Sequence, residues 1–358
     1  MKKLLSVLLI LCLSLPVALA GWEDEPYHFP QVVVSGENKS KEYKSFYNSG
    51  ELSLVIPGCS QDFIPQGIAY YSERDLVFFS GYSSNEGMPC ALMAVDRKTN
   101  QVVKEIFLAY PDGREFCEHA GGVCVTDKNI FISDESHLYR MSLETFLTAD
   151  NSCLYNFDEA IPVPCKASFC QISNGILWVG EFEHTTSDSK GTQYKTDKSH
   201  HMKVNGGENT GWVLGYKLNS SAENELDPGC ISGSGAIPNY ILSTTNRIQG
   251  FTISNGSIYL SQSYGRKNSS TLYRHKNVLS EAPNTQAQVY GTQVPVWFLD
   301  NNSQSDTLTA PPMTEGLCTI DGKVYVLFES AASYYRIPLD DKGPSKEPVD
   351  QIFRLDTF

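Results

Sequence analysis

The stretch Gln249–Ser263, QGFTISNGSIYLSQS, decides the fold class of this chain. Apolar and polar residues alternate on both sides of the dipeptide Asn255-Gly256. A period of two residues is typical of a strand with one buried face, and Asn-Gly between two such runs is a strong signal for a tight turn. The stretch therefore predicts a β-hairpin.

The same hairpin pattern occurs five times along the chain. The other copies are Gln66–Tyr82 (QGIAYYSERDLVFFSGY), Gly121–Glu135 (GGVCVTDKNIFISDE), Ala167–Phe182 (ASFCQISNGILWVGEF) and Glu315–Glu329 (EGLCTIDGKVYVLFE). In four of the five copies, the first apolar residue lies seven positions before the apolar residue that begins the second strand. Five copies of one unit indicate a repeat protein.

Further apolar segments extend each hairpin into a four-stranded antiparallel sheet. Three of these segments resemble one another: LYRM at 138–141, LYRH at 272–275 and YYRI at 334–337. Val294–Leu299 is expected to be the outer strand of the fourth copy. Glu51–Ile56 precedes the first copy and is expected to complete the last sheet, beside the C-terminal strand at Gln351–Leu355.

Because a single hairpin cannot bury both of its faces, the sheets must pack against one another. Four-stranded antiparallel sheets of this size, arranged radially, form an all-β fold, the β-propeller. We expect five blades. Six remain possible if the N-terminal fifty residues and the tail assemble another sheet, and a two-sheet sandwich is the rival architecture.

The N-terminus is typical of a secretory signal peptide. Lys2-Lys3, the apolar run Leu4–Leu15 and the small-residue ending Ala18-Leu19-Ala20 predict residues 1–20 as the signal, cleaved after Ala20. The apolar run is shorter than the roughly 20 residues that span a bilayer, and no later stretch is long enough. We expect an N-terminal extension at 21–50, a single propeller domain at 51–358, and a secreted or periplasmic location.

The chain is acidic, with 28 Lys and Arg against 41 Asp and Glu and a net charge of −13. Such a charge opposes nonspecific binding to nucleic acid or to an anionic membrane. It is compatible with a cationic or metal partner, and equally with simple solubility.

The cysteines divide into two groups. Cys124, Cys170 and Cys318 occupy one repeat position, where a small buried side chain is expected and where neighbouring sulfurs should be too far apart to bridge. The remaining six of the exported chain are expected to form up to three disulfides of undetermined pairing. They are Cys59, Cys90, Cys117, Cys153, Cys165 and Cys230.

The repeat resembles the secreted propellers of the NHL, SMP-30 and strictosidine-synthase-like group, over residues 66–355. The pair Glu315-Gly316, which begins an inner strand, is similar to the metal-binding Glu-Gly of SMP-30-type lactonases. The resemblance implies the propeller fold, and it makes Glu315 a candidate metal ligand.

In a propeller, the first strands line a central channel, and their starts share one face with the ends of the second strands. Loops of several repeats on one face form the binding sites of such scaffolds. We therefore expect a ring of candidate ligand-binding residues at the channel mouth. They are Gln66, His119, Gln249 and Glu315 from the starts, and Tyr82, Asp134, Glu135, Glu181, Gln262, Arg266 and Glu329 from the ends.

Carboxylates in such a ring suit a hard cation such as Ca²⁺, which takes 6 to 8 oxygen ligands. Crowded carboxylates also raise one another's pKa and supply an acid and a base. The alternative is that these residues are solvated or cap backbone groups. His119 is a candidate base or metal ligand, or it hydrogen-bonds to a neighbouring blade. Arg266 is expected to form an ion pair with Glu315.

The polar insertion at 184–210 is expected to be a mobile surface loop with solvated histidines at 184, 200 and 201. The sequence contains no HExxH, GxSxG, P-loop or EF-hand motif. The first hypothesis is a binding module for a small polar ligand, a glycan or a protein. The alternative is a metal-assisted hydrolase of lactonase or esterase type, and a purely structural role is the third.

Overall fold

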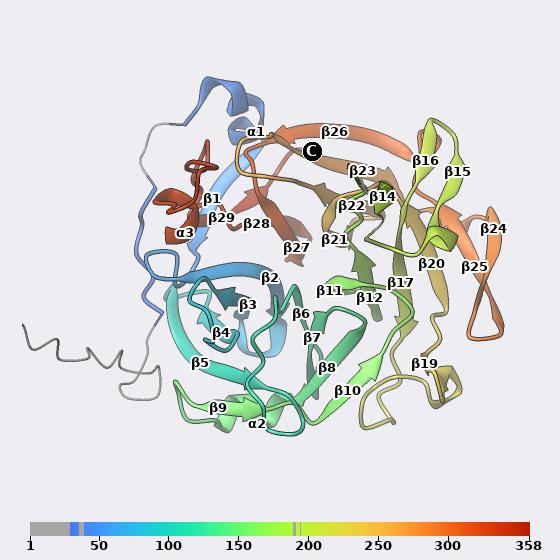
Figure 1. Ribbon diagram of the computed structural model, residues 1–358, viewed down its shortest axis with the longest axis horizontal. Coiled ribbons are helices and arrows are strands. Elements are labelled where there is room, and N and C mark those ends of the chain that lie inside the picture. The colour runs from blue at the N-terminus through green and yellow to red at the C-terminus, as the bar shows by residue number, and fades with distance from the viewer. Residues whose placement is uncertain (1–28, 36–38, 189–190, 194) are drawn as a thin grey trace, which may run out of the picture.

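Five β-sheets surround a central axis, each with its first strand nearest the axis (Figure 1). The computed structural model describes residues 29–35, 39–188, 191–193 and 195–358. The chain is thus an all-β, five-bladed β-propeller, as the five hairpins predicted, and not a six-bladed propeller or a sandwich. The predicted signal peptide at 1–20 lies outside the described residues. No helix in the described ranges is long and apolar enough to cross a membrane.

The first three blades begin with the first three hairpin copies, and two of them exceed four strands. Blade 1 consists of β2 (Phe63–Tyr71), β3 (Leu76–Ser83), β4 (Ala91–Asp96), β5 (Gln101–Ala109) and the parallel strand β9 (Leu154–Asn156). Blade 2 consists of β6 (Gly122–Val125), β7 (Asn129–Asp134), β8 (His137–Ser142) and β10 (Glu159–Pro162). Blade 3 consists of β11 (Ala167–Ser173), β12 (Ile176–Glu181), β17 (Gly211–Lys217), β20 (Tyr240–Thr244), β25 (Thr292–Phe298) and β24 (Thr285–Val289).

The last two blades have four strands each, and the ring closes between the two ends of the chain. Blade 4 consists of β21 (Ile248–Ser254), β22 (Ser257–Gln262), β23 (Ser270–Lys276) and β26 (Gln304–Ala310). Blade 5 consists of β27 (Thr314–Ile320), β28 (Lys323–Phe328), β29 (Gln351–Leu355) and β1 (Gly50–Val55). The N-terminal strand β1 pairs antiparallel with β29, so the predicted closure is confirmed.

Two segments predicted as blade strands differ from the prediction: one joins another blade, and the other is a helix. The segment predicted at Val294–Leu299 forms β25, which pairs in parallel with β20 and so enlarges blade 3. The outer strand of blade 4 is instead the polar segment β26, whose exposed residues conceal the alternating pattern. The segment predicted at Tyr334–Ile337 is a short helix, α3 (Ser333–Arg336), because the C-terminal segment β29 takes the next place in the sheet.

The remaining elements lie in the connections and in the N-terminal extension. The helices are η1 (Lys41–Tyr43), α1 (Lys44–Asn48), η2 (Ser72–Arg74), α2 (Leu143–Thr148), η3 (Lys198–His200), η4 (Pro228–Cys230) and η5 (Val278–Ser280). Short hairpins join β13 (Thr186–Asp188) to β14 (Gly191–Gln193), β15 (Met202–Val204) to β16 (Gly207–Asn209), and β18 (Ile231–Ser232) to β19 (Gly235–Ala236). In α1, the ring of Phe46 packs 4.1 Å from that of Phe353 and so covers the closing blade.

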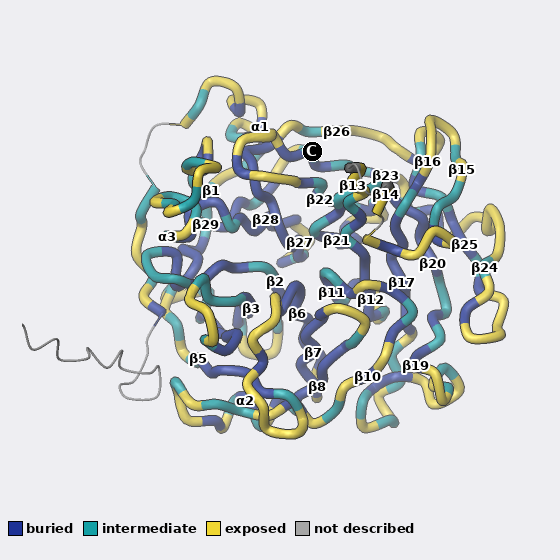
Figure 2. Tube along the Cα trace, in the orientation of Figure 1, coloured by how far each residue is buried: buried dark blue, intermediate teal, exposed yellow. Residues whose placement is uncertain are grey.

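The core lies in layers between consecutive blades, and buried residues follow the strands while exposed ones follow the outer loops (Figure 2). Phe78 of blade 1 packs in one layer with Ile132 of blade 2, and Trp178 of blade 3 packs in another with Phe251 of blade 4. Strands buried on both faces are expected where sheets stack radially. Burial of apolar area between blades therefore stabilises the ring.

Close to the axis, the first strands approach one another so tightly that there is no room for a side chain. A Cβ built on Gly67 would lie 2.5 Å from the backbone N of Val123, and one on Gly250 would lie 2.5 Å from the backbone O of Glu315. Gly122 faces the backbone of blade 3 in the same way. The glycines that begin the repeats are therefore a packing requirement of the ring.

The described cysteines, numbers 59 to 318, are all free, so the prediction of disulfides is wrong for them. Cys59, Cys90 and Cys165 are buried in three different layers between blades and cannot meet. The thiols of Cys124 and Cys170 are closer than predicted, because they lie on converging inner strands and hydrogen-bond to each other. Burial raises the pKa of the Cys124 thiol well above its usual range.

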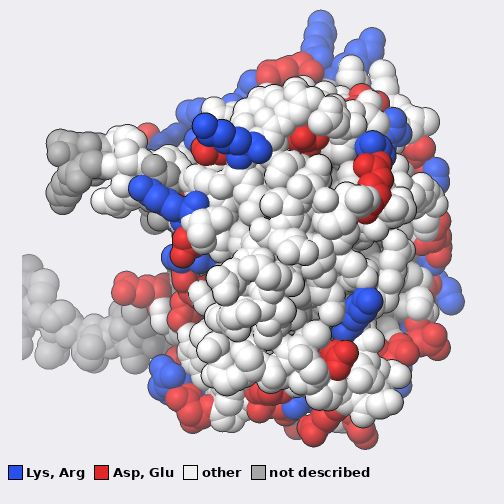
Figure 3. All heavy atoms as spheres, turned by 90° about the vertical axis from the view of Figure 1, so that its right-hand side faces the viewer, with Lys and Arg blue, Asp and Glu red and all other residues white. Residues whose placement is uncertain are grey.

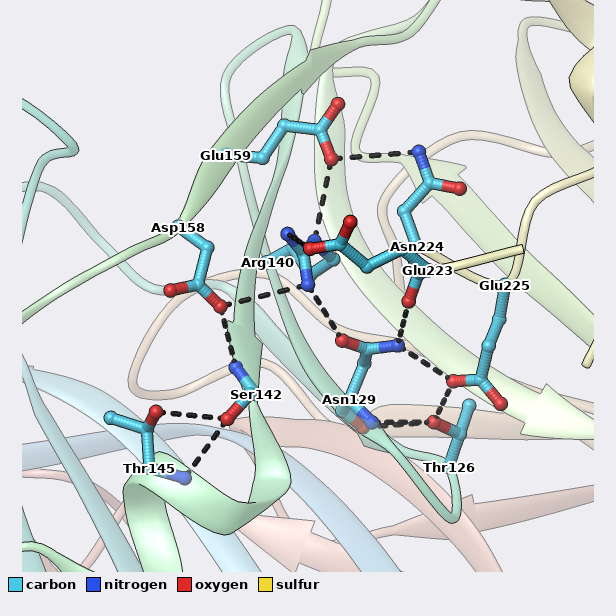
Figure 4. Close-up of polar contacts among 10 residues, drawn as sticks. All are labelled: Thr126, Asn129, Arg140, Ser142, Thr145, Asp158, Glu159, Glu223, Asn224 and Glu225. Carbon is cyan, nitrogen blue, oxygen red and sulfur yellow. Dashed lines mark hydrogen bonds and ion pairs between the residues drawn. The ribbon is translucent and has the colours of Figure 1, made fainter. Parts of the chain in front are cut away.

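A polar network ties blade 2 to the loop that follows β17 (Figure 4). The guanidinium of Arg140 donates to Asn129 Oδ1 at 3.0 Å and lies within 3.3 to 3.6 Å of the carboxylates of Asp158, Glu159 and Glu223. Its side chain is only 8% exposed, so these partners compensate for the desolvation of a buried charge. The network satisfies itself, which is typical of a structural contact between blades.

We predict that Gly122→Ala destabilises the ring. The new Cβ would lie 2.2 Å from the backbone N of Cys170, and backbone cannot move as a side chain can. Chemical denaturation should show a loss of about 2 kcal/mol in the free energy of unfolding. Gly233→Ala is the matched control, because a Cβ there meets no atom within 4 Å. Equal stabilities of the two variants would contradict the packing argument.

Candidate functional site

A cavity of about 240 Å³ lies at the channel mouth, where the first strands begin and the second strands end. We call it the mouth cavity. Seven of the eleven predicted residues line it: Gln66, Tyr82, His119, Asp134, Glu135, Gln249 and Glu329. The wall is completed by Gly121, Lys166, Ala167, Ser168, Phe182, Lys195 and Tyr335. Every blade contributes, so the cavity exists only in the closed ring.

The channel below the cavity is obstructed by a side chain from blade 3. Gln171, on β11, is buried and donates from Nε2 to the backbone oxygens of Leu317 at 2.6 Å and Ile68 at 3.2 Å. These acceptors belong to blades 5 and 1, so the amide crosses the axis. The buried amide of Gln171 therefore links the inner strands of blades 1, 3 and 5 near the axis.

Two carboxyl groups at the wall form a pair that we call the acid pair, Glu315 and Glu329. Their side chains hydrogen-bond to each other. Nε2 of Gln249 donates to Glu315 Oε1 at 3.1 Å, and Nε2 of Gln66 donates to Glu329 Oε2 at 2.9 Å. Glu315 is 2% exposed and lies behind Gln249, whereas Glu329 reaches the cavity. The pair thus holds two amides in place.

The acid pair shares a proton at neutral pH. Burial raises the pKa of Glu315 well above its ordinary value, and the charge of Glu329 raises it further. Burial also raises the pKa of Glu329, to about 7, although hydrogen bonds from Gln66, Glu315 and Tyr335 oppose the rise. Two adjacent buried carboxyls cannot both ionise cheaply, so Glu315 keeps its proton and donates a hydrogen bond to Glu329.

Aromatic rings and a third carboxyl complete the wall. The hydroxyls of Tyr82 and Tyr335 lie 3.4 Å apart, and the Tyr82 ring lies 4.9 Å from the ring of His119. Asp134 is buried and accepts the backbone N–H of His119 at 3.1 Å. Burial raises the pKa of Asp134 to about 7. His119 is exposed at the rim, on a backbone that Asp134 fixes.

Besides Glu315, three predicted site residues lie outside the mouth cavity. Gln262 donates to Asn246 and accepts from the Tyr273 hydroxyl at 2.9 Å. Arg266 does not pair with Glu315 as expected; it forms a bidentate pair with Asp340, at 2.6 and 2.7 Å. Asp340 lies in the connection between α3 and β29. No local sequence pattern predicts that it approaches Arg266.

The third, Glu181, turns away from the channel and anchors the insertion. Its carboxylate accepts from His200 Nδ1 at 2.9 Å and from the backbone N–H of Trp212 at 3.0 Å. His200 was expected to be solvated, yet it is 6% exposed and its ring stacks on Trp212 at 3.7 Å. The insertion is therefore attached to blade 3, because the carboxylate of Glu181 at the end of β12 binds His200 of the insertion.

The predicted ring of site residues left out seven residues of the cavity wall. Lys166 and Ser168 flank the first residue of β11, so their place next to an inner strand was a usable signal. Lys195 lies in the insertion and Tyr335 in a segment predicted as a strand. Only the path of these connections brings the last two to the mouth.

The described residues contain no group of three or more His, Cys, Asp or Glu side chains arranged to hold a metal ion. Glu315 has one acidic neighbour, and both amides beside the acid pair turn N–H groups toward it. N–H groups repel a cation, and Ca²⁺ requires at least six oxygen ligands. The geometry thus gives no support to the predicted metal role of Glu315.

No protein-family model and no curated protein sequence matches this chain. Solved structures similar to it include a calcium-binding protein, regucalcin, from Agrobacterium tumefaciens, at 12% identity and a TM-score of 0.39 over 86% of this chain and 93% of that one. Myxococcus xanthus glutaminyl cyclase is 10% identical, with a TM-score of 0.37 over 85% and 94% of the two chains. Kuenenia stuttgartiensis hydrazine synthase is 11% identical, with a TM-score of 0.34, and here 74% of this chain spans 55% of the other.

The five blade sheets confirm the propeller fold that the resemblance to SMP-30-type proteins implied.

We predict that Glu315→Gln flattens the pH dependence of stability. The folded-state pKa of Glu315 is raised, so its contribution is complete below the unfolded value of 4.5 and is lost as the pH rises toward the folded value. A glutamine binds no proton. Denaturation between pH 5 and 8 should show a slope smaller by roughly 1 kcal/mol per pH unit.

The exposed residue Glu86 provides the control, since Glu86→Gln removes a surface carboxyl outside the acid pair. Its profile should follow that of the parent protein. Parallel profiles for the parent and Glu315→Gln would show that the acid pair does not retain a proton.

Proposed function

We propose that this protein is an exported binding module for a small, neutral, polyhydroxylated ligand of monosaccharide size. The main observation in its support is that the acid pair holds the amides of Gln66 and Gln249 at the mouth cavity, with N–O distances of 2.9 and 3.1 Å. Neither amide oxygen has a hydrogen-bond partner within the described part of the chain. Such oxygens are acceptors ready for ligand hydroxyls.

The charge state of the cavity favours a neutral ligand. The acid pair retains at least one proton near pH 7, and a raised pKa leaves Asp134 partly protonated there. Lys166 at the rim is paired with Glu135 at 3.5 Å. With Lys195 as a second lysine and Glu329 as a partly ionised carboxyl, the described wall mixes charges of both signs and does not select strongly for an ion of one sign.

The shape and lining agree with a saccharide. The cavity is concave and measures about 240 Å³, smaller than the range for drug-sized ligands. Aromatic side chains, Tyr82, Phe182 and Tyr335, stand among its hydrogen-bonding groups. Aromatic faces pack against the C–H faces of a sugar ring, while amides and carboxyls bind its hydroxyls.

Export is part of this proposal and rests on the sequence of residues 1–20. A lysine pair, a short apolar run and a small-residue ending support a cleaved signal. The acidic composition supports a soluble protein outside the cytoplasm, without affinity for nucleic acid.

A hydrolase is the second candidate, favoured by the raised pKa of Glu329 at the cavity wall. A carboxyl with a pKa of about 7 suits acid and base catalysis at neutral pH. However, Glu315 lies behind Gln249 and is 2% exposed, so only one carboxyl of the pair can touch a substrate. Under this candidate, Glu329→Gln would abolish turnover and leave substrate binding in place.

We predict that Gln249→Ala weakens saccharide binding about tenfold, because it removes one amide that contacts the ligand. Isothermal titration with glucose, galactose, mannose and N-acetylglucosamine measures the effect, with glutamate as a charged comparison. Gln262→Ala is the matched control, since that amide bonds to Asn246 outside the cavity. Binding of glutamate but of no sugar would contradict the proposal.

A further inference from the structure

A second cavity of about 610 Å³ lies on the flank of blade 3, and we call it the flank groove. It is bounded by the insertion, by the segment before β11 and by the tip of the β24–β25 hairpin. Its lining includes Pro164, Cys165, His200, Trp212, Gln288 and Tyr290. Lys166 and Lys195 line both the flank groove and the mouth cavity, so the two cavities adjoin.

The flank groove contains a fixed imidazole. His200 is 6% exposed and its ring stacks on Trp212 with an interplanar angle of 15°. Nδ1 lies 2.9 and 3.0 Å from the two oxygens of Glu181. Glu181 is itself 1% exposed and also accepts backbone N–H groups from Trp212 and Lys166. A carboxylate can only accept hydrogen bonds, so the ring nitrogen of His200 that faces it, Nδ1, carries a hydrogen.

The other ring nitrogen of His200 is available to a ligand. Nε2 has no hydrogen-bond partner in the described ranges, and it is not among the enclosed atoms that lack one. With Nδ1 bonded to Glu181, Nε2 is the ring nitrogen that remains for a ligand hydroxyl in the groove. A buried side chain with one unpartnered nitrogen facing a cavity is a built acceptor for a hydroxyl or an N–H group.

The surroundings of His200 suit a neutral, hydroxyl-rich chain. Tyr290 is 41% exposed at the hairpin tip and offers an aromatic face, beside the amide of Gln288. The side of the molecule around β24 and β25 shows few charged side chains in its centre (Figure 3). Lys195 lies over the ring of Phe182 at 4.9 Å, between the two cavities. The groove therefore repeats the chemistry of the mouth cavity.

We propose that the flank groove is a second subsite for the ligand of the mouth cavity, and that this ligand is an oligosaccharide. One terminal sugar occupies the mouth cavity, the chain passes Lys166 and Lys195, and a later sugar donates a hydroxyl to His200 Nε2. This inference rests on the proposed function. It makes the insertion, which carries Lys195 and His200, a specificity element of the protein.

Isothermal titration with chito-, cello- and malto-oligosaccharides of one to four sugars tests the inference. Affinity for the recognised series should rise about tenfold or more between one and three sugars. His200→Ala and Gln288→Ala should abolish that rise and leave the affinity for the single sugar unchanged. Gln288 is exposed on an edge strand, so its loss cannot unfold the protein.

His275→Ala is the matched control, because His275 is a buried histidine of blade 4 whose Nδ1 bonds to Ser303 at 3.0 Å. It should keep the dependence on chain length. An affinity that does not change with length would overturn the second subsite and leave the proposed function standing. A length dependence that persists in both groove variants would overturn the subsite as well. Failure of every sugar, at every length, would overturn the proposed function together with the inference.

Discussion

The close approach of the five innermost strands around the axis is the constraint on which this structure depends. Radially packed sheets can converge only where their backbones nearly touch, and Gly67, Gly122 and Gly250 leave the required space. The apolar layers between blades, from the Phe78–Ile132 layer to the Trp178–Phe251 layer, form because this convergence aligns one sheet with the next. Antiparallel pairing of β1 with β29 joins the ends of the chain and leaves no gap in the ring.

The same convergence creates the mouth cavity. Inner strands that all begin at one end of the axis bring polar side chains from distant parts of the sequence into one wall, as with Gln66 and Glu329 at 2.9 Å. Burial then determines the chemistry. Glu315 and Glu329 are too close and too enclosed to ionise together, so they share a proton and serve as a fixed support for amides.

The insertion shows how one acidic position can acquire a different role. Glu181 ends a second strand like the other predicted mouth residues, but it turns outward to His200 and Trp212. Nearby, Glu183 accepts the backbone N–H and the hydroxyl of Thr196, both at 2.7 Å. These two carboxylates fasten an otherwise polar segment against blade 3, and that attachment brings Lys195 to the mouth and His200 to the flank.

The amino-acid sequence by itself determined the repeat, the number of blades and half of the residues that line the mouth cavity. Hairpin signals are local, since the alternation around Asn255-Gly256 depends on neighbours along the chain, and equivalent positions of equivalent repeats must meet at one end of a ring. Only the tertiary structure decided that Val294–Leu299 lies against β20, that Arg266 pairs with Asp340, and that His200 is buried. These outcomes depend on the paths of long connections. Each path is set by contacts with residues far away in the sequence, and a short stretch of sequence does not show which residues those are.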